Sequence, residues 1–243
     1  MPQELLGEVQ APSGVVLIVD TGLLGSWSVE TPRVTVAGVP KDRALQVFGA
    51  RMNEEPFAQL WRTVSLEVQP AGKTARTIEA GSVPVDFARL MFIDSAAVAR
   101  WEHEQPTDGR ADFVFWGRDA AQAAAQTNAP KLSDGQFGWV DLEVAAAVTH
   151  GRAVEALRGP LKFATDFRPH SHHFHLLAQM RGTSTESGTL EVGGARCCGF
   201  FTQWGDGVFP VRTELDSEGG LVRIVVELGT KEAVRNLRAV NGL

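Results

Sequence analysis

The feature that most constrains the fold is a succession of short strands in the C-terminal part of the chain. Residues 161–228 predict about five strands. The last two form a β-hairpin in "GVFPVRTELDSEGGLVRIVVEL", with its turn at Asp216 to Gly220. In the second arm, apolar residues at 222, 224, 226 and 228 alternate with polar ones and therefore share one face of a strand. Strands joined by short turns pair antiparallel.

The rest of the chain adds strands and helices without a regular β-α-β alternation. Strands are predicted in "GVVLIVD" (14–20), "RVTVAGV" (33–39), "RTVSLEV" (62–68), "DFARLMFID" (86–94) and "DFVFW" (112–116). Helices are predicted in "GRDAAQAAAQTN" (117–128), "DLEVAAAVTHGRAVEALRG" (141–159) and "TKEAVRNLRAV" (230–240). Segments 42–61 and 95–104 favour short helices. The sequence therefore predicts an α+β fold with largely antiparallel β-sheets and a few flanking helices.

The length of the chain bears on its domain organisation. With 243 residues it is long enough to form one large β-rich domain over 1–243, which is our expectation. The alternative is a subdivision into a mixed α/β part over 1–159 and an antiparallel β part over 160–243 that ends in the C-terminal helix. No internal repeat or long linker decides between the two.

Charge and apolar runs indicate partners and location. The net charge is −6, and no block of Lys or Arg is dense enough to follow a phosphate backbone, so we expect no nucleic-acid partner. The longest aliphatic run, "VVLIV" (15–19), is far too short to cross a membrane, and "MPQELLGEV" lacks the features of a secretory leader. We therefore expect a cytoplasmic protein without a membrane partner. The sequence is compatible with a homo-oligomer.

The two cysteines, Cys197 and Cys198, are adjacent. A disulfide between neighbouring residues closes a strained ring and is easily reduced. We therefore expect two reduced thiols that point to opposite faces of a strand, as is usual in cytoplasm. A redox switch formed by the pair is the alternative.

Four of the six histidines lie within "DFRPHSHHFH" (166–175). On a strand they would alternate between faces, with His170 and His172 on one and His173 and His175 on the other. Either pair has a spacing at which two imidazoles bind one metal ion, and Asp166 or Glu186 would be a further ligand. The incomplete ligand set favours histidines at a sheet edge without metal. We therefore expect no cofactor, with a divalent metal ion as the alternative.

Several carboxylates beside glycines or at element ends are candidates for ligand binding or acid–base chemistry: Asp20, Asp134, Asp141, Glu186 and Asp206. Their ordinary roles are in turns and helix caps, and Asp141 can cap the helix that follows it. Acid–base chemistry needs two carboxylates at a defined separation, which a sequence does not give. No nucleophile elbow, glycine-rich phosphate loop or HExxH helix is present. The sequence therefore leaves open whether the protein is an enzyme.

The stretch "FTQWGDGVFPV" (201–211) contains a bulky aromatic residue and an acid between two glycines. If Trp204 is exposed, the run Trp204, Gly205, Asp206 and Gly207 would form a recognition site for a small ligand or a protein, because glycines leave backbone N–H groups accessible. In the alternative, Trp204 closes the end of a sheet and Asp206 bonds its own turn.

The chain resembles an uncharacterised bacterial domain-of-unknown-function family. The family's C-terminal hallmark is a Trp-Gly-Asp-Gly-Val-(Tyr or Phe)-Pro run, present here as "WGDGVFP". "APSGVVLIVD", "RLMFIDSAAVARWE" and "GQFGWVD" are similar to other segments of the family. The resemblance implies that Asp20, Trp101, Asp141 and the run 204–207 belong to a common framework. This chain has Thr202 and Gln203 where the family has a Ser-Gly pair.

Three functions are compatible with these patterns. The first is a bacterial ligand- or protein-binding module, regulatory or immunity-like, whose recognition turn is Trp204 to Gly207. The second is a metal-dependent hydrolase or related enzyme that uses the histidines of 170–175. The third is a structural or assembly role, which a large exposed apolar sheet face would indicate.

Overall fold

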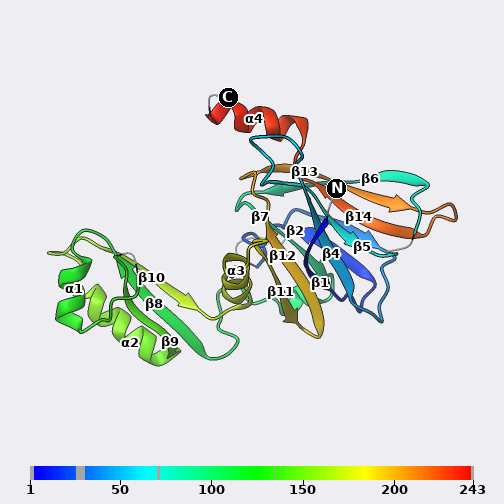
Figure 1. Ribbon diagram of the computed structural model, residues 1–243. Helices are drawn as coiled ribbons and strands as arrows, with labels where there is room; N and C mark the ends of the chain where they lie inside the picture. The colour runs from blue at the N-terminus through cyan, green and yellow to red at the C-terminus, as the bar shows by residue number, and fades with distance from the viewer. Residues whose placement is uncertain (1–2, 26–30, 70–71, 134, 242–243) are drawn as a thin grey trace. The chain divides into compact units, whose positions relative to one another are not determined.

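The computed structural model describes residues 3–25, 31–69, 72–133 and 135–241 (Figure 1). The chain divides into two compact units. The first, which we call the sandwich unit, contains residues 1–101 and 176–243, and the second, the inserted unit, contains residues 102–175.

The sandwich unit is built from two antiparallel sheets. The six-stranded sheet has the order β1-β4-β5-β14-β13-β6, and the five-stranded sheet has the order β11-β12-β7-β2-β3. The strands of the first are β1 (Gln3–Val9), β4 (Leu45–Arg51), β5 (Trp61–Glu67), β6 (Arg76–Val85), β13 (Gly207–Leu215) and β14 (Leu221–Glu227). Those of the second are β2 (Val15–Val19), β3 (Arg33–Ala37), β7 (Arg89–Asp94), β11 (Ser187–Val192) and β12 (Ala195–Phe201).

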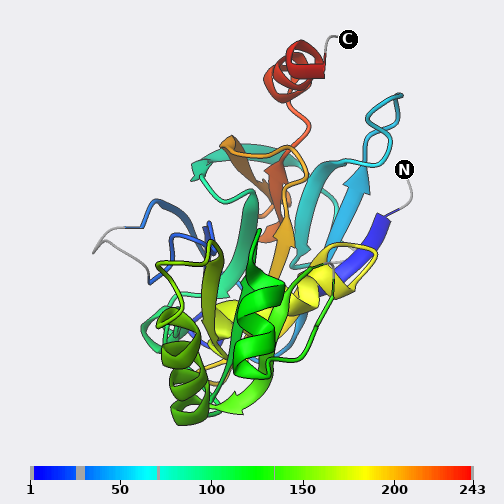
Figure 2. The same cartoon turned by 90° about the vertical axis from the view of Figure 1, so that its left-hand side faces the viewer.

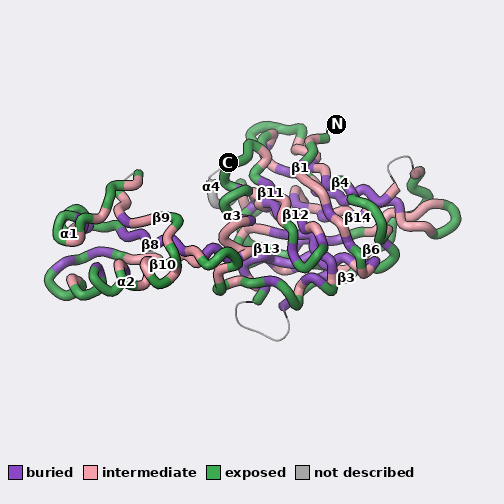
Figure 3. The backbone as a smooth tube through the Cα atoms, turned by 90° about the horizontal axis from the view of Figure 1, so that it is seen from below, coloured by how far each residue is buried: buried purple, intermediate pink, exposed green. Residues whose placement is uncertain are grey.

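The core of the sandwich unit lies between the two sheets, because each strand turns alternate side chains inward. In β14 the inward residues Val222, Ile224 and Val226 are fully buried, as the alternation predicts, and so is Leu228 just beyond the strand. Figure 3 shows buried segments along the strands of this unit. Apolar side chains from both sheets join the same cluster, including Ile18, Val64 and Phe200.

The outer face of the five-stranded sheet carries a second apolar cluster. In β2, Val16 and Ile18 join the core between the sheets, whereas Leu17 and Val19 join this second cluster. Leu176 and Met180, from α3 (His172–Gly182), cover it together with Ala97 of the 3-10 helix η1 (Ala97–Arg100). The five-stranded sheet is therefore buried on both faces.

The adjacent cysteines lie on β12 of this doubly buried sheet. Cys198 belongs to the core between the sheets and Cys197 to the outer cluster, so the two thiols point to opposite faces as expected. Both are free and buried. Burial raises the pKa of Cys197 to about 12 and also raises that of Cys198.

The inserted unit contains a three-stranded antiparallel sheet of order β10-β8-β9 and two helices. Its strands are β8 (Arg110–Trp116), β9 (Phe137–Glu143) and β10 (Ala164–Pro169), and its helices are α1 (Ala120–Thr127) and α2 (Val144–Glu155). Phe113 and Phe115 of β8 pack with Ala123 of α1 and Val154 of α2 in a separate core. Figure 2 shows the two helices, in green, lying against the strands of this unit. One face of the sheet is thus apolar and covered by helices.

The fold class is confirmed, since the structure is α+β with three antiparallel sheets and four α-helices among the described residues. The helices predicted at 117–128, 141–159 and 230–240 are present as α1, α2 and α4 (Lys231–Asn241). None of the helices in the described part of the chain is long and apolar enough to cross a membrane.

Two local predictions were wrong, and a third holds only in part. Segment 42–61 contains strand β4 instead of a helix, because Leu45, Val47 and Gly49 turn alternately toward the core. In segment 95–104 the helical part is one short 3-10 turn, Ala97–Arg100. Asp141 does not cap α2, because it lies within β9 and the helix follows Glu143.

The unit bounds also differ from a subdivision after residue 159. Residues on both sides of that position pair in one sheet, since β10 (164–169) pairs along its whole length with β8 (110–116). The inserted unit therefore extends across it.

Candidate functional site

The candidate site lies in the inserted unit, where β8 begins and β10 ends. The two strands pair antiparallel, with Arg168 opposite Asp112 and Pro169 opposite Ala111. Antiparallel pairing brings the residue after β10, His170, next to the start of β8, and its backbone N–H donates to Arg110 O at 2.9 Å. Asp108 lies in the turn just before β8. Segments about 60 positions apart in the chain therefore meet here.

His170 is held between two carboxylates. Its Nε2 lies 2.9 Å from Asp112 Oδ1, and its Nδ1 lies 3.1 Å from Asp108 Oδ2. The ring of Phe174 stacks on the imidazole with centroids 4.5 Å apart. Burial by itself lowers the pKa of His170, but the hydrogen bonds and charges of Asp112 and Asp108 outweigh it, so the pKa is raised. The imidazole is thus fixed in orientation at both nitrogens.

A β-bulge fixes Asp112. Ala111 is opposite Leu142 and Phe113 is opposite Trp139, so two residues of β9, Val140 and Asp141, face Asp112 alone. Asp141 has a left-handed backbone with φ of 57°, a conformation that Asp tolerates better than most residues. Its N–H donates to Asp112 Oδ1 at 2.8 Å. The sequence-predicted residue Asp141 therefore contributes to the site through its backbone.

His175 completes the cluster from the first turn of α3. Its Nε2 lies 3.7 Å from Asp108 Oδ2. A carboxylate oxygen of Asp108 and one ring nitrogen from each of His170 and His175 lie within 4.8 Å of one another. A tetrahedral zinc ion with bonds of 2.0–2.1 Å has ligand atoms about 3.3 Å apart. The two carboxylate–imidazole separations, 3.1 and 3.7 Å, are close to that value. Asp108 is exposed, so the cluster is open to solvent.

The other two histidines of the predicted set lie elsewhere. His172 Nδ1 accepts a hydrogen bond from the N–H of Glu102 at 2.9 Å, and burial lowers its pKa. His173 stacks on His103 with centroids 4.2 Å apart. The predicted pairs, 170 with 172 and 173 with 175, assumed a strand, whereas residues 172–182 form α3. The pair that the fold brings together is His170 with His175.

The further carboxylate ligands were not identified correctly from the sequence. Asp166 pairs with Arg168 at 2.6 Å, and Glu186 belongs to the sandwich unit. The carboxylates at the histidines are Asp108 and Asp112, which sequence reasoning missed. Their spacing in "TDGRADF" is not diagnostic, and only the pairing of β8 with β10 brings them to His170.

The Trp204 turn has a different geometry in the sandwich unit. The indole is 9% exposed, and its Nε1 donates to Trp61 O at 2.7 Å. Asp206 Oδ1 accepts from the N–H of Ala88 at 3.0 Å instead of bonding its own turn. Gly205 has a positive φ of 78°, as expected for a turn. Trp204 therefore lies against the end of β5, inside the molecule.

Gln203, next to Trp204, links two further segments. Its side-chain Oε1 accepts from Trp61 N at 3.0 Å, and its Nε2 donates to Glu186 Oε2 at 2.6 Å. Gln203, Glu186 and Ala88 all have left-handed backbones, with φ of 64°, 52° and 52°. Such conformations cost free energy in non-glycine residues and persist where surrounding contacts fix them. The turn is thus a tightly bonded junction.

Asp20 is fully buried in the sandwich unit. Its carboxylate accepts N–H groups from Gly22 at 2.7 Å, Asp86 at 2.7 Å and Phe87 at 2.9 Å. Burial raises its pKa, and these backbone hydrogen bonds oppose the increase. Its role in the structure is to hold two loops together. Asp134 lies outside the described residues.

Comparison of the chain with protein-family models, with curated proteins and with solved structures found no match. The geometry of the described residues therefore carries the functional argument.

Proposed function

We propose that the inserted unit binds a divalent transition-metal ion through Asp108, His170 and His175, and that the protein is a metal-dependent hydrolase. The observation that carries this proposal is the convergence of two imidazoles and a carboxylate, with one oxygen and two nitrogens within 4.8 Å of one another. Two imidazoles and one carboxylate are a ligand set that zinc accepts in hydrolytic sites.

Asp112 supports this assignment as an outer carboxylate. With His170 neutral and protonated on Nε2, Asp112 accepts a hydrogen bond from Nε2–H, and the lone pair of the imidazole lies on Nδ1, toward Asp108. Metal-binding histidines commonly donate their second N–H to a carboxylate in this way, which fixes the tautomer and makes the ligand nitrogen more basic. Asp112 is itself fixed by the N–H of Asp141.

Three protein ligands leave a position for water. If bound there, a zinc ion would act as a Lewis acid that activates water for hydrolysis of an ester, amide or phosphoester. The exposed side of Asp108 is where a substrate would approach. Assays with esters, amides and phosphoesters would identify which of these bonds the protein hydrolyses.

The recognition function considered for Trp204 to Gly207 has less support as a direct contact. The indole is buried and its N–H group is already bonded to Trp61 O. We place the protein in the cytoplasm of a bacterium, as the resemblance and the reduced, buried thiols suggest.

Thermal unfolding with and without metal tests the proposal. Protein stripped with a chelator should gain several degrees in Tm when Zn²⁺ is added, because a ligand that binds only the folded state stabilises it. His172→Gln is the matched control and should respond like the wild type, whereas His175→Gln should not. An equal rise in Tm for His175→Gln would contradict the assignment. Hydrolysis of chromogenic esters and phosphoesters by the zinc-loaded protein then identifies the reaction.

A further inference from the structure

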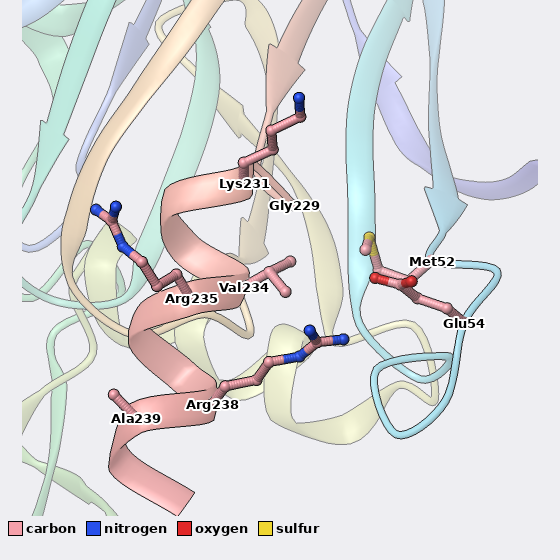
Figure 4. Close-up of a pocket in the computed structure, with 8 residues that line it drawn as sticks. All are labelled: Met52, Glu54, Gly229, Lys231, Val234, Arg235, Arg238 and Ala239. Atoms are coloured by element: carbon pink, nitrogen blue, oxygen red, sulfur yellow. The ribbon is translucent and has the colours of Figure 1, made fainter. Parts of the chain in front are cut away.

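The sandwich unit contains a pocket between α4 and the connection from β4 to β5, separate from the proposed metal site. Its volume is about 590 Å³, within the range of small-molecule sites. Its lining residues are Met52, Glu54, Gly229, Lys231, Val234, Arg235, Arg238 and Ala239. Figure 4 shows Val234 and Arg238 extending from α4 toward the segment that carries Met52 and Glu54.

The position of α4 is fixed at its start and along its apolar face. Thr230 Oγ1 accepts the N–H of Ala233 at 3.1 Å and caps the helix. Ala233, Val234 and Leu237 pack against the core between the sheets. The apolar face of the helix is therefore covered, and the basic residues beside it border the pocket.

The pocket has an excess of positive charge. Lys231, Arg235 and Arg238 border it, against the single acid Glu54. Among the described residues, no carboxylate lies within 4.0 Å of the side-chain nitrogens of Lys231 or Arg238. Arg235 pairs with Glu232 only at 4.0 Å, where both side chains are 76% exposed. These cations are consequently available to a ligand.

The inner wall of the pocket is apolar and backed by the Trp204 turn. A Cβ on Gly229 would lie 2.5 Å from Met52 Sδ and 3.3 Å from Trp204 Cζ2. The absence of a side chain at Gly229 therefore allows Met52 and Trp204 to pack closely against the backbone here. Trp204 packs on Phe57 with ring centroids 5.9 Å apart. The guanidinium of Arg238 lies 5.5 Å from the Phe57 ring centroid. The turn thus supports the pocket from inside without lining it.

We propose that this pocket binds a small organic anion, one that combines a phosphate or carboxylate group with an apolar portion. Arg238 faces the anionic group, since a guanidinium pairs with either oxyanion in a forked geometry, and Lys231, at the other end of the pocket (Figure 4), adds positive charge. Met52 and Val234 contact the apolar portion. The site is independent of the metal centre and gives the sandwich unit a binding role.

Titration calorimetry with phenyl phosphate and phenylacetate as probes, on the full chain, tests this assignment. At least one probe should bind saturably to the wild type, and Arg238→Gln should weaken it about tenfold, the expected effect of losing a charge-assisted hydrogen bond. Arg33→Gln, which removes an exposed charge from the edge strand β3, is the matched control and should bind like the wild type.

Two substitutions of opposite charge at Ala239 test the effect of charge separately from any effect on folding. Ala239 is exposed, so Ala239→Glu and Ala239→Lys are both tolerated sterically, and they should weaken and strengthen binding respectively. Inorganic phosphate should bind more weakly than phenyl phosphate because it lacks the apolar portion. Absence of saturable binding of both probes, equal affinity for all variants, or equal affinity for inorganic and phenyl phosphate would overturn the proposal.

Discussion

At the scale of single residues, Gln203 shows how one position can combine strain and stabilisation. Its left-handed backbone, with φ of 64°, is a conformation that favours Gly. The Gln side chain offsets the strain because it bonds both Trp61 N and Glu186. The side-chain hydrogen bonds therefore compensate locally for the backbone strain.

Two substitutions at Gln203 separate these effects. Gln203→Ala loses the hydrogen bonds and keeps the strain, and should lower the free energy of unfolding by about 2 kcal/mol. Gln203→Gly also loses the bonds but relieves the left-handed backbone, which recovers about 1 kcal/mol. Urea denaturation of both variants measures the difference. If Gln203→Ala were as stable as Gln203→Gly, the backbone strain would not be real.

Single residues also limit what the sequence predicts about the site. His170 and His175 were candidates because clustered histidines are visible in the sequence. Asp108 and Asp112 were not, because aspartates in turns and at strand starts are common. These two aspartates contact His170 only because β8 pairs with β10, about 60 positions away in the chain, and no local sequence pattern encodes that pairing.

At the scale of elements, the alternation of apolar and polar residues predicted most strands correctly. It failed where contacts with residues elsewhere in the chain determine the local structure. In β4, a Cβ on Gly49 would lie 2.7 Å from the Trp61 ring, so a residue with no side chain is needed there and the strand pattern is obscured. In α3, the three histidines concealed the helix, although Ser171 accepts the N–H of Phe174 at its start and Leu176 and Met180 follow at helical spacing.

The end of α2 offers a test by pH. The hydrogen bonds from Arg158 and Thr165 lower the pKa of Glu155 from 4.5 to about 2. A depressed folded-state pKa stabilises the protein above the unfolded value, and that contribution is lost as the pH falls from 4.5 through about 2. Because Glu155 is 41% exposed, Glu155→Gln should lower Tm by only about 2 °C at pH 6.

The difference in Tm between Glu155→Gln and the wild type should shrink as the pH falls below 4.5 and be largely lost by about pH 2, where half of the folded protein has a protonated Glu155 carboxyl. Calorimetric scans over this range provide the measurement. A difference that stays constant with pH would show that the carboxylate charge is not responsible.

At the scale of the whole molecule, the sequence predicted the class of fold but not its division. The succession of strands without β-α-β units was sufficient for an antiparallel α+β protein. The inserted unit is distinguished by its own sheet and its own core. Packing, which depends on contacts distant in sequence, is what separates the units.

The division also separates the two proposed activities. The metal ligands belong to residues 102–175, whereas the anion pocket belongs to the sandwich unit. Each can therefore be removed by substitution without altering the other, and failure of one proposal leaves the other standing.

The binding of a metal ion by Asp108, His170 and His175 can be tested by the metal content of untagged protein purified without chelator. The wild type is compared with a His170→Ala/His175→Ala double variant and a His172→Ala/His173→Ala control. We expect close to one metal ion per chain in the wild type and the control, and none in the first double variant. A metal-free wild type that also fails to take up added Zn²⁺, or equal metal in all three proteins, would contradict it.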